Sequence, residues 1–196
     1  MPDELEAIRA EIAGDPSNAE QAALGWAPLF TASATARIVI IGQAPGRRAQ
    51  ASGIPWDDPS GDKLRDWLGV TAEQFYDPAL IALMPMDFYY PGKGKSGDLP
   101  PRRDFAPKWH PRILARLTDV RLTVVLGAYA IRHYLGDAAK SNLTETVRSF
   151  REYGPAVIPL VHPSPLNFRW QMKNPWFDEE VIPELRRLVR GALPGN

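Results

Sequence analysis

The sequence predicts an α/β fold, a three-layer sandwich in which helices flank a central, mostly parallel sheet of four strands. Two observations support this class. Four short apolar runs are almost continuous and rich in β-branched residues, as is typical of strands buried on both faces of a parallel sheet. Segments whose apolar residues have helical spacing alternate with these runs. Strands that alternate with helices indicate a sheet with helices on both faces.

The expected elements follow in chain order. An amphipathic helix over residues 2–13 has Leu5, Ile8 and Ile12 at helical spacing and should pack on the outside of the core. Strands are expected at residues 37–41, 80–84, 122–126 and 157–161. Helices are expected at residues 63–68, 107–117, 128–135 and 177–189. A capping box formed by Thr71 and Gln74 predicts the start of one more helix.

The segment over residues 85–107 is long and rich in proline and glycine, and its sequence looks too polar for the core. Loops of this length inside a compact domain are usually functional or disordered. The triplet Phe88, Tyr89 and Tyr90 and the nearby Trp109 favour order, because disordered segments are poor in aromatic residues. We therefore expect an ordered, functional loop.

The composition limits the class of protein. With 196 residues, of which 44% are hydrophobic and 23% charged, the chain can bury one core. We expect one domain over residues 1–196, with an N-terminal helical part at 1–36 and a core at 37–190. No apolar run approaches the roughly 18 residues that cross a bilayer, and the first residues are acidic, unlike a signal peptide. We expect a monomeric, cytoplasmic protein with no membrane partner.

The chain has no cysteine, and its histidines are His110, His133 and His162. The lack of cysteine excludes disulfides, thiolate zinc sites, cysteine nucleophiles and iron–sulfur clusters, and we expect neither a metal nor a cofactor. The formal net charge is zero, so any surface that attracts nucleic acid must be local.

Basic residues cluster in three expected loops. Solvated loop charge would explain any one cluster, whereas three clusters around one crevice favour contacts with phosphates. The clusters are Arg47 and Arg48; Lys93, Lys95, Arg102, Arg103, Lys108 and Arg112; and Arg169 and Lys173.

Two stiff polar loops follow expected strands. Residues 42–46 (Gly-Gln-Ala-Pro-Gly) come after the first strand, and residues 162–167 (His-Pro-Ser-Pro-Leu-Asn) come after the fourth. Ligands bind at the carboxyl ends of the strands in an open α/β sheet. We therefore expect these loops to form two walls of one crevice.

Three motifs match known sites only in part. Residues 94–96 match the end of a phosphate-binding P-loop, but Tyr89 stands where the leading glycine should be and Pro100 blocks the following helix. Residues 60–63 fit the S-x-x-K motif of penicillin-interacting serine enzymes, without its companion Ser-x-Asn. Residues 42–46 are not the dinucleotide fingerprint. An ATPase, such a serine enzyme and a Rossmann cofactor are therefore not expected.

Four ordered stretches resemble the motifs of the uracil-DNA glycosylase superfamily: residues 42–46, residues 53–61, the strand that ends at Met84, and residues 162–166. The resemblance spans roughly residues 37–190, and its last motif is the most specific. It implies a monofunctional enzyme of base-excision repair that flips uracil or a related damaged base out of DNA and hydrolyses its N-glycosidic bond. A noncatalytic protein that binds damaged DNA or other nucleic acid on the same fold is the first alternative, and a hydrolase of free nucleotides is the second.

In this resemblance, His162 corresponds to the histidine that hydrogen-bonds the oxygen of the leaving base. Alternatively, it only caps the strand. Ser164 would bind a DNA phosphate, and Leu166 resembles the wedge that fills the gap left by the flipped base, although it could simply anchor the loop. Further DNA contacts are expected at Pro45, Gly46, Arg47, Pro165, Asn167 and Arg169.

The first motif departs from the best-known branch, in which an aspartate after the glutamine positions the attacking water. Here that residue is Ala44, which cannot polarise water. Gln43 is expected to act in catalysis and, together with Ala44, to contact the base. Asp58 or Asp62 in the next loop would then position the water, although both carboxylates could instead stabilise a turn and a helix start. The iron–sulfur branch is excluded, because its cysteines are absent.

The residues expected to contact the base are also atypical. Trp56 stands where the family has an aromatic that stacks on the extruded base; alternatively, it packs in the core and Phe88 is the platform. Met84 occupies the place of the uracil-reading asparagine, and a thioether cannot form the paired contacts of an amide. Either Asp87 or backbone groups read the base, or the pocket also admits deaminated purines.

Overall fold

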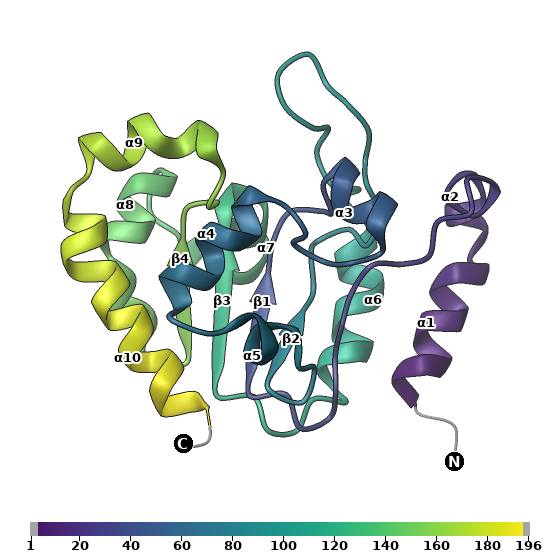
Figure 1. The fold of residues 1–196 in the computed structure, drawn as a ribbon, viewed down its shortest axis with the longest axis horizontal. Coiled ribbons are helices and arrows are strands. Elements are labelled where there is room, and N and C mark those ends of the chain that lie inside the picture. The colour runs from purple at the N-terminus through teal and green to yellow at the C-terminus, as the bar shows by residue number, and fades with distance from the viewer. Residues whose placement is uncertain (1–3, 194–196) are drawn as a thin grey trace.

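The protein has a central sheet of four strands that all run parallel, in the order β2-β1-β3-β4 (Figure 1). The computed structural model describes residues 4–193. The strands are β1 (Ile38–Ile41), β2 (Ile81–Leu83), β3 (Leu122–Leu126) and β4 (Val157–Leu160). Every residue of β1 and β2 is buried, as expected for strands covered on both faces. The α/β class and the four strands predicted from the sequence are confirmed.

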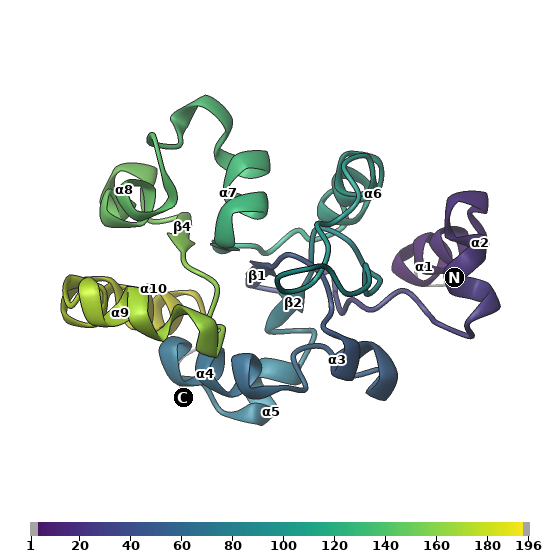
Figure 2. The same ribbon diagram turned by 90° about the horizontal axis from the view of Figure 1, so that it is seen from above.

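Helices cover both faces of the sheet (Figure 2). One face carries α6 (Phe105–Leu114), α7 (Gly127–Leu135) and α8 (Leu143–Arg148). The opposite face carries α3 (Arg47–Ser52), α4 (Pro59–Leu68), α5 (Ala72–Tyr76), α9 (Phe168–Lys173) and α10 (Ile182–Ala192). None of the helices between residues 4 and 193 is long and apolar enough to cross a membrane.

The N-terminal part lies beside α6, beyond the β2 edge of the sheet (Figure 2). It consists of α1 (Glu4–Gly14), a 3₁₀ turn at Pro16–Asn18 and α2 (Ala19–Ala23). Leu5, Ile8 and Ile12 are buried, so the predicted apolar stripe of the first helix is confirmed. Residues 2 and 3, with which the predicted helix began, lie outside the described residues.

Several helix boundaries differ from the prediction. The predicted helix at 63–68 begins at Pro59, because Asp58 caps its N-terminus and a proline is favourable at the first helical position. The predicted helix at 177–189 starts with a π-helical turn at Phe177–Val181 and continues as α10. The capping box of Thr71 and Gln74 is present at the start of α5. The short helices α2, α3, α8 and α9 were not predicted.

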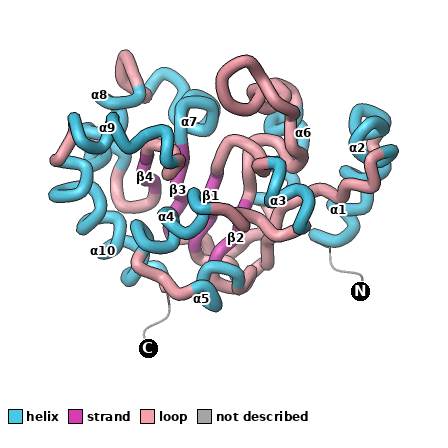
Figure 3. The backbone as a smooth tube through the Cα atoms, turned by 45° about the horizontal axis from the view of Figure 1, so that its top comes forward, coloured by secondary structure: helices cyan, strands magenta, loops and turns pink. Residues whose placement is uncertain are grey.

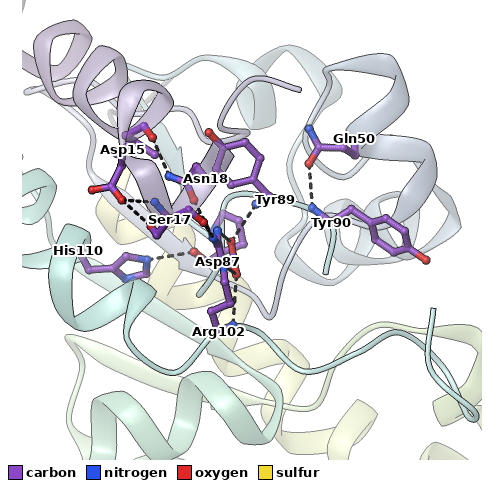
Figure 4. A network of polar contacts seen from close by, with 11 residues as sticks. Asp15, Ser17, Asn18, Gln50, Asp87, Tyr89, Tyr90, Arg102 and His110 are labelled. Atoms are coloured by element: carbon purple, nitrogen blue, oxygen red, sulfur yellow. Dashed lines mark hydrogen bonds and ion pairs between the residues drawn. The ribbon is translucent and has the colours of Figure 1, made fainter. Parts of the chain in front are cut away.

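The long segment between β2 and α6 is ordered and irregular, and in Figure 3 it is the loop that projects before α6. Its first part is not polar surface, contrary to the prediction: Met86, Asp87, Phe88 and Tyr89 are buried. Asp87 can be buried there because its charge is paired with that of Arg102. Arg102 binds both carboxylate oxygens of Asp87, at 2.7 and 2.8 Å, so the acid can be buried at low cost (Figure 4).

The Asp87–Arg102 pair also ties this segment to its neighbours. Arg102 donates to the Ser17 backbone oxygen and to Asn18 Oδ1, at 3.0 and 2.7 Å, which fastens the loop to the turn after α1 (Figure 4). The Asp87 backbone amide donates to the Gln43 carbonyl oxygen at 3.2 Å. The loop after β1 and the N-terminal part are therefore held by one polar network.

Candidate active site

A cavity of about 440 Å³ opens at the carboxyl ends of the strands. The loop after β1 and the loop after β4 both line it, so the two polar loops form walls of one crevice, as the sequence predicts. The strands β1 and β3 lie at the centre of the sheet, and the chain continues from β1 to β2 on one side and from β3 to β4 on the other. Crevices in open α/β sheets form at this reversal of strand order. The chemically relevant lining residues are Gln43, Ala44, Pro45, Gly46, Trp56, Asp58, Ser60, Lys93, Ser96, Asp98, His162, Ser164, Leu166 and Asn167.

His162 follows β4 after one further buried residue, Val161, and lines the cavity. Its imidazole stacks on the indole of Trp56, with ring centroids 5.5 Å apart and planes 25° apart. Burial lowers the pKa of His162 below 6.5, and the negative charge of Asp58 opposes this shift. Within residues 4–193 its ring nitrogens have no hydrogen-bond partner. The imidazole is therefore neutral at pH 7 and has an N–H that can donate to a ligand.

Trp56 is held in a strained backbone conformation, with φ of 58°. Two glycines make room for it. A Cβ at position 42 would lie 2.9 Å from Cζ2 of the indole, and a Cβ at position 61 would lie 1.9 Å from the Trp56 carbonyl oxygen. Left-handed φ values at non-glycine residues are uncommon and occur often at functional sites. The half-buried ring packs against the core, which was one of the two roles considered for it, and it also lines the cavity.

Asp58 caps a helix and also lines the cavity. Its Oδ1 accepts a hydrogen bond from the Gly61 amide at 3.0 Å and so caps α4. Its other oxygen, Oδ2, would lie 3.4 Å from a Cβ at position 46, and therefore adjoins the first loop. Asp62 does not line the cavity; its side chain is 78% exposed and pairs with Arg65. Of the two candidate carboxylates, only Asp58 reaches the site.

The loop after β4 is closed by its own hydrogen bonds. Ser164 Oγ accepts from the Leu166 amide at 3.2 Å, and Asn167 Nδ2 donates to the His162 carbonyl oxygen at 2.7 Å. Leu166 is 85% exposed at the tip, which does not fit an anchor in the core. Of the other predicted DNA contacts, Pro45, Gly46 and Asn167 line the cavity, whereas Arg47, Pro165 and Arg169 lie outside its lining.

A further wall is a short hairpin at residues 91–99. It lies in the segment expected to be a functional loop and carries Lys93 of the expected basic clusters, but none of its residues was predicted to contact the base. Lys93 and Asp98 form an antiparallel bridge, and the Leu99 amide donates to the Gly92 carbonyl oxygen at 2.9 Å. Gln43 Nε2 donates to the Leu99 carbonyl oxygen at 3.2 Å, so the hairpin is fastened to the first loop. The side chain of Ala44 also lines the cavity and is apolar.

Two residues expected to contact the base lie elsewhere. Met84 and Phe88 are fully buried and do not line the cavity. The Met84 amide donates to the Ile40 carbonyl oxygen at 2.9 Å, which continues the pairing of β2 with β1. Phe88 stacks between Phe30 and His110, with centroids 4.5 and 5.5 Å away. Both belong to the core, and Asp87 is engaged by Arg102, so none of the three faces the cavity.

Several residues of the basic clusters form ion pairs within the protein. This corrects the expectation that all three clusters face phosphates. Arg102, Lys108 and Arg112 pair with acidic side chains, of which two lie on the N-terminal part. Arg48 and Lys93 pair with Asp57 and Asp98. Within the three clusters, the residues that have no ion-pair partner in the described part of the chain are Arg47, Lys95, Arg103, Arg169 and Lys173.

No group of three histidine, aspartate or glutamate side chains that could hold a metal ion is found within residues 4–193. The cavity thus offers one neutral imidazole, one carboxylate and an aromatic ring, next to an exposed leucine. A family model described as the uracil DNA glycosylase superfamily matches residues 29–186, which is more than half of the chain and includes every residue of the cavity lining.

Proposed function

Because the chain belongs to the uracil DNA glycosylase superfamily, we propose that it is a DNA glycosylase that flips uracil or a related damaged base out of DNA and hydrolyses its N-glycosidic bond. The observation that carries the proposal is the neutral imidazole of His162, which makes no hydrogen bond among the described residues and stacks on Trp56 inside a cavity beside the exposed Leu166. These features supply a leaving-group donor, a ring platform and a wedge within one site.

His162 stabilises the departing base. When the N-glycosidic bond breaks, negative charge develops on the base and positive charge on the sugar. A neutral N–H that donates to a base oxygen meets this negative charge as it forms, and such donors are most effective in a site that excludes water. Because burial lowers the pKa of His162, the imidazole carries no positive charge at pH 7.

Asp58 positions the attacking water. Ala44 cannot do so, and Asp62 points to solvent and Arg65. The capping bond of Asp58 engages Oδ1 alone, which leaves Oδ2 beside Gly46 to accept a hydrogen bond from water. A carboxylate there also stabilises the positive charge that develops on the sugar.

The DNA lies across the mouth of the cavity. Leu166 fills the gap that the flipped nucleotide leaves, because an apolar side chain between base steps offsets part of the unstacking energy. Ser164 contacts a phosphate, and Arg47 and Arg169, which form no ion pair with the described residues, extend the basic surface around the cavity. The extruded base lies against Trp56, and stacking of this kind contributes about 1–3 kcal/mol per base.

The test is excision by the purified protein. Oligonucleotides that carry uracil, hypoxanthine, xanthine or ethenocytosine, in single and double strands, are incubated with protein and then with alkali, which cleaves at abasic sites. We expect cleavage for at least one deaminated base, and a loss of at least about 100-fold in the single-turnover rate for His162→Ala, as for other removed transition-state donors. Near-normal rates in a folded His162→Ala protein would exclude this histidine from the mechanism.

The apolar Ala44 favours one other function, a protein that binds damaged DNA without catalysis. Tight binding to a lesion-containing duplex, with no abasic product on any of the four substrates, would support that function and contradict the enzyme. Release of base from free deoxyuridine nucleotides, but not from oligonucleotides, would instead indicate a nucleotide hydrolase. Borohydride is expected to trap no covalent complex, because a monofunctional enzyme forms no Schiff base with the sugar.

A further inference from the structure

We propose that the hairpin at residues 91–99 reads the extruded base, and that its Lys93 and Asp98 select bases with a lactam edge, a ring N–H next to a carbonyl oxygen. This inference rests on the proposed function, because it assigns a reader to the same cavity. The residues expected to read the base cannot do so, because Met84 and Phe88 are fully buried and Asp87 is bound by Arg102. Another group must therefore recognise the base.

The hairpin presents a donor and an acceptor side by side. Lys93 and Asp98 are directly opposite each other in an antiparallel bridge, so their side chains lie on the same face. Lys93 Nζ lies 3.8 Å from Asp98 Oδ1, and both residues line the cavity. The carboxylate accepts hydrogen bonds only, and the ammonium group donates only. The pair therefore matches a base edge on which an N–H and a carbonyl oxygen are neighbours.

Deamination creates this edge. Uracil has an N3–H beside O4, and hypoxanthine has an N1–H beside O6. In the parent bases cytosine and adenine, the ring nitrogen is an acceptor and the neighbouring group is an amine, so Asp98 would face a lone pair and Lys93 would face a donor. The pair accordingly favours the deaminated product over its parent. Thymine and guanine have the same edge as the products, so this pair excludes only cytosine and adenine.

The position of the hairpin is fixed by contacts outside the pair. Gln43 Nε2 holds the Leu99 carbonyl oxygen at 3.2 Å. Tyr90 supports the start of the hairpin, because its amide donates to Gln50 Oε1 at 2.9 Å and its hydroxyl donates to Asp98 at 3.4 Å. The buried Asp87–Arg102 pair clamps both ends of the segment (Figure 4). A reader must be held in place in this way for its hydrogen bonds to discriminate.

The experiment compares oligonucleotides that carry uracil, N3-methyluracil or cytosine at one position. Methylation removes the N–H and keeps both carbonyl oxygens. Excision rates and equilibrium binding are both measured, for the unchanged protein and for Asp98→Ala, Asp98→Asn and Asp137→Asn. The control residue Asp137 is exposed, and the 3₁₀ turn that contains it follows α7, outside the cavity lining. Melting temperatures report whether each variant is folded.

We expect the unchanged protein to prefer uracil over N3-methyluracil by about 10- to 100-fold, the effect of one hydrogen bond to a charged group. Asp98→Ala should reduce this preference to less than about threefold, and Asp98→Asn should be intermediate, because a neutral acceptor binds more weakly. Asp137→Asn should match the unchanged protein.

The outcomes separate this inference from the proposed function. Excision with a preference that Asp98→Ala leaves unchanged would overturn the hairpin as reader, while the glycosylase would stand. No excision, together with a binding preference for uracil that Asp98→Ala abolishes, would uphold the reader and overturn the glycosylase. The absence of both excision and binding preference would contradict both proposals.

Discussion

The indole of Trp56 stacks on the imidazole of His162, with ring centroids 5.5 Å apart and ring planes inclined by 25°. This contact joins the loop before α4 to the loop after β4, two segments that are more than a hundred residues apart in the sequence. The indole also removes water from one face of the imidazole. The stack therefore fixes the orientation of His162 and contributes to the burial that lowers its pKa.

Replacement of Trp56 should raise the pKa of His162. In Trp56→Ala the imidazole gains water on one face, so its charged form is penalised less and its pKa should move up toward 6.5. Trp56→Phe should retain most of the effect. The pKa can be followed by the NMR titration of the imidazole protons. An unchanged pKa in a folded Trp56→Ala protein would contradict the role of the indole in shielding His162.

The backbone of Trp56 provides a matched comparison. Trp56→Gly and Trp56→Ala remove the same ring, but only alanine retains the penalty of a left-handed φ, about 1 kcal/mol. Trp56→Gly should therefore be the more stable of the two variants in urea unfolding. Both should excise the damaged base more slowly than the unchanged protein, since neither offers a ring to stack on it.

Asp58 has a capping role and a proposed catalytic role, which two substitutions can separate. Asparagine caps a helix as well as aspartate does, so Asp58→Asn should keep the melting temperature and lose excision, by roughly 10- to 1000-fold. Asp58→Ala should lose excision and also about 1 kcal/mol of stability. The exposed Asp62 supplies the control: Asp62→Asn should excise normally. If Asp58→Asn excised normally as well, the carboxylate would be a helix cap only.

Leu166→Ala should leave stability almost unchanged, because the side chain is 85% exposed and makes few contacts to lose. Its effect should appear in DNA. Excision from a duplex should fall by more than excision from a single strand, which needs no wedge to replace a flipped base. The rates on matched single- and double-stranded substrates measure this difference. Leu24→Ala, at another exposed leucine, is the control; equal losses on both substrates would argue against a wedge.

The sequence was informative where a local pattern decides the structure. The β-branched runs located all four strands, because strands buried on both faces must be apolar throughout. The Asp58–Pro59 pair is also a local signal for a helix start, although the predicted helix began only at residue 63, and the observed cap agrees with the structural role considered for Asp58. The loops after β1 and β4 were located because each follows a buried strand.

The remaining parts depend on contacts between distant residues. The helix α3 has no apolar stripe, since its sequence is Arg-Arg-Ala-Gln-Ala-Ser, and therefore has no helical periodicity to detect. The hairpin joins the site through the backbone carbonyl of Leu99, which carries no sequence signal, 56 residues from Gln43. Met84 follows a strand, as a base-reading residue would, but its burial depends on packing that the sequence does not specify.

The buried His110 makes stability depend on pH. Its Nε2 donates to the Pro85 carbonyl oxygen at 3.0 Å, since a carbonyl only accepts, so in the neutral form Nδ1 accepts from the Tyr134 hydroxyl at 2.6 Å. Burial lowers the pKa of His110 from 6.5 to about 4. Below pH 6.5 His110 therefore binds a proton in the unfolded chain, whereas in the folded chain it stays neutral down to about pH 4. Stability is complete above pH 6.5 and falls as the pH drops toward 4, by on the order of 3 kcal/mol.

The free energy of unfolding in urea, measured at pH 7, 6 and 5, tests this dependence. The carboxylates with lowered pKa values, such as Glu11 and Glu184, change protonation at lower pH. The slope above pH 5 therefore belongs mainly to His110 and His162, whose pKa burial also lowers. His110→Gln keeps hydrogen-bonding groups and cannot gain a proton. It should be less stable at pH 7 and should lose the larger part of the slope, with the part due to His162 remaining. A slope that His110→Gln leaves unchanged would mean that His110 is already protonated in the folded protein at pH 5.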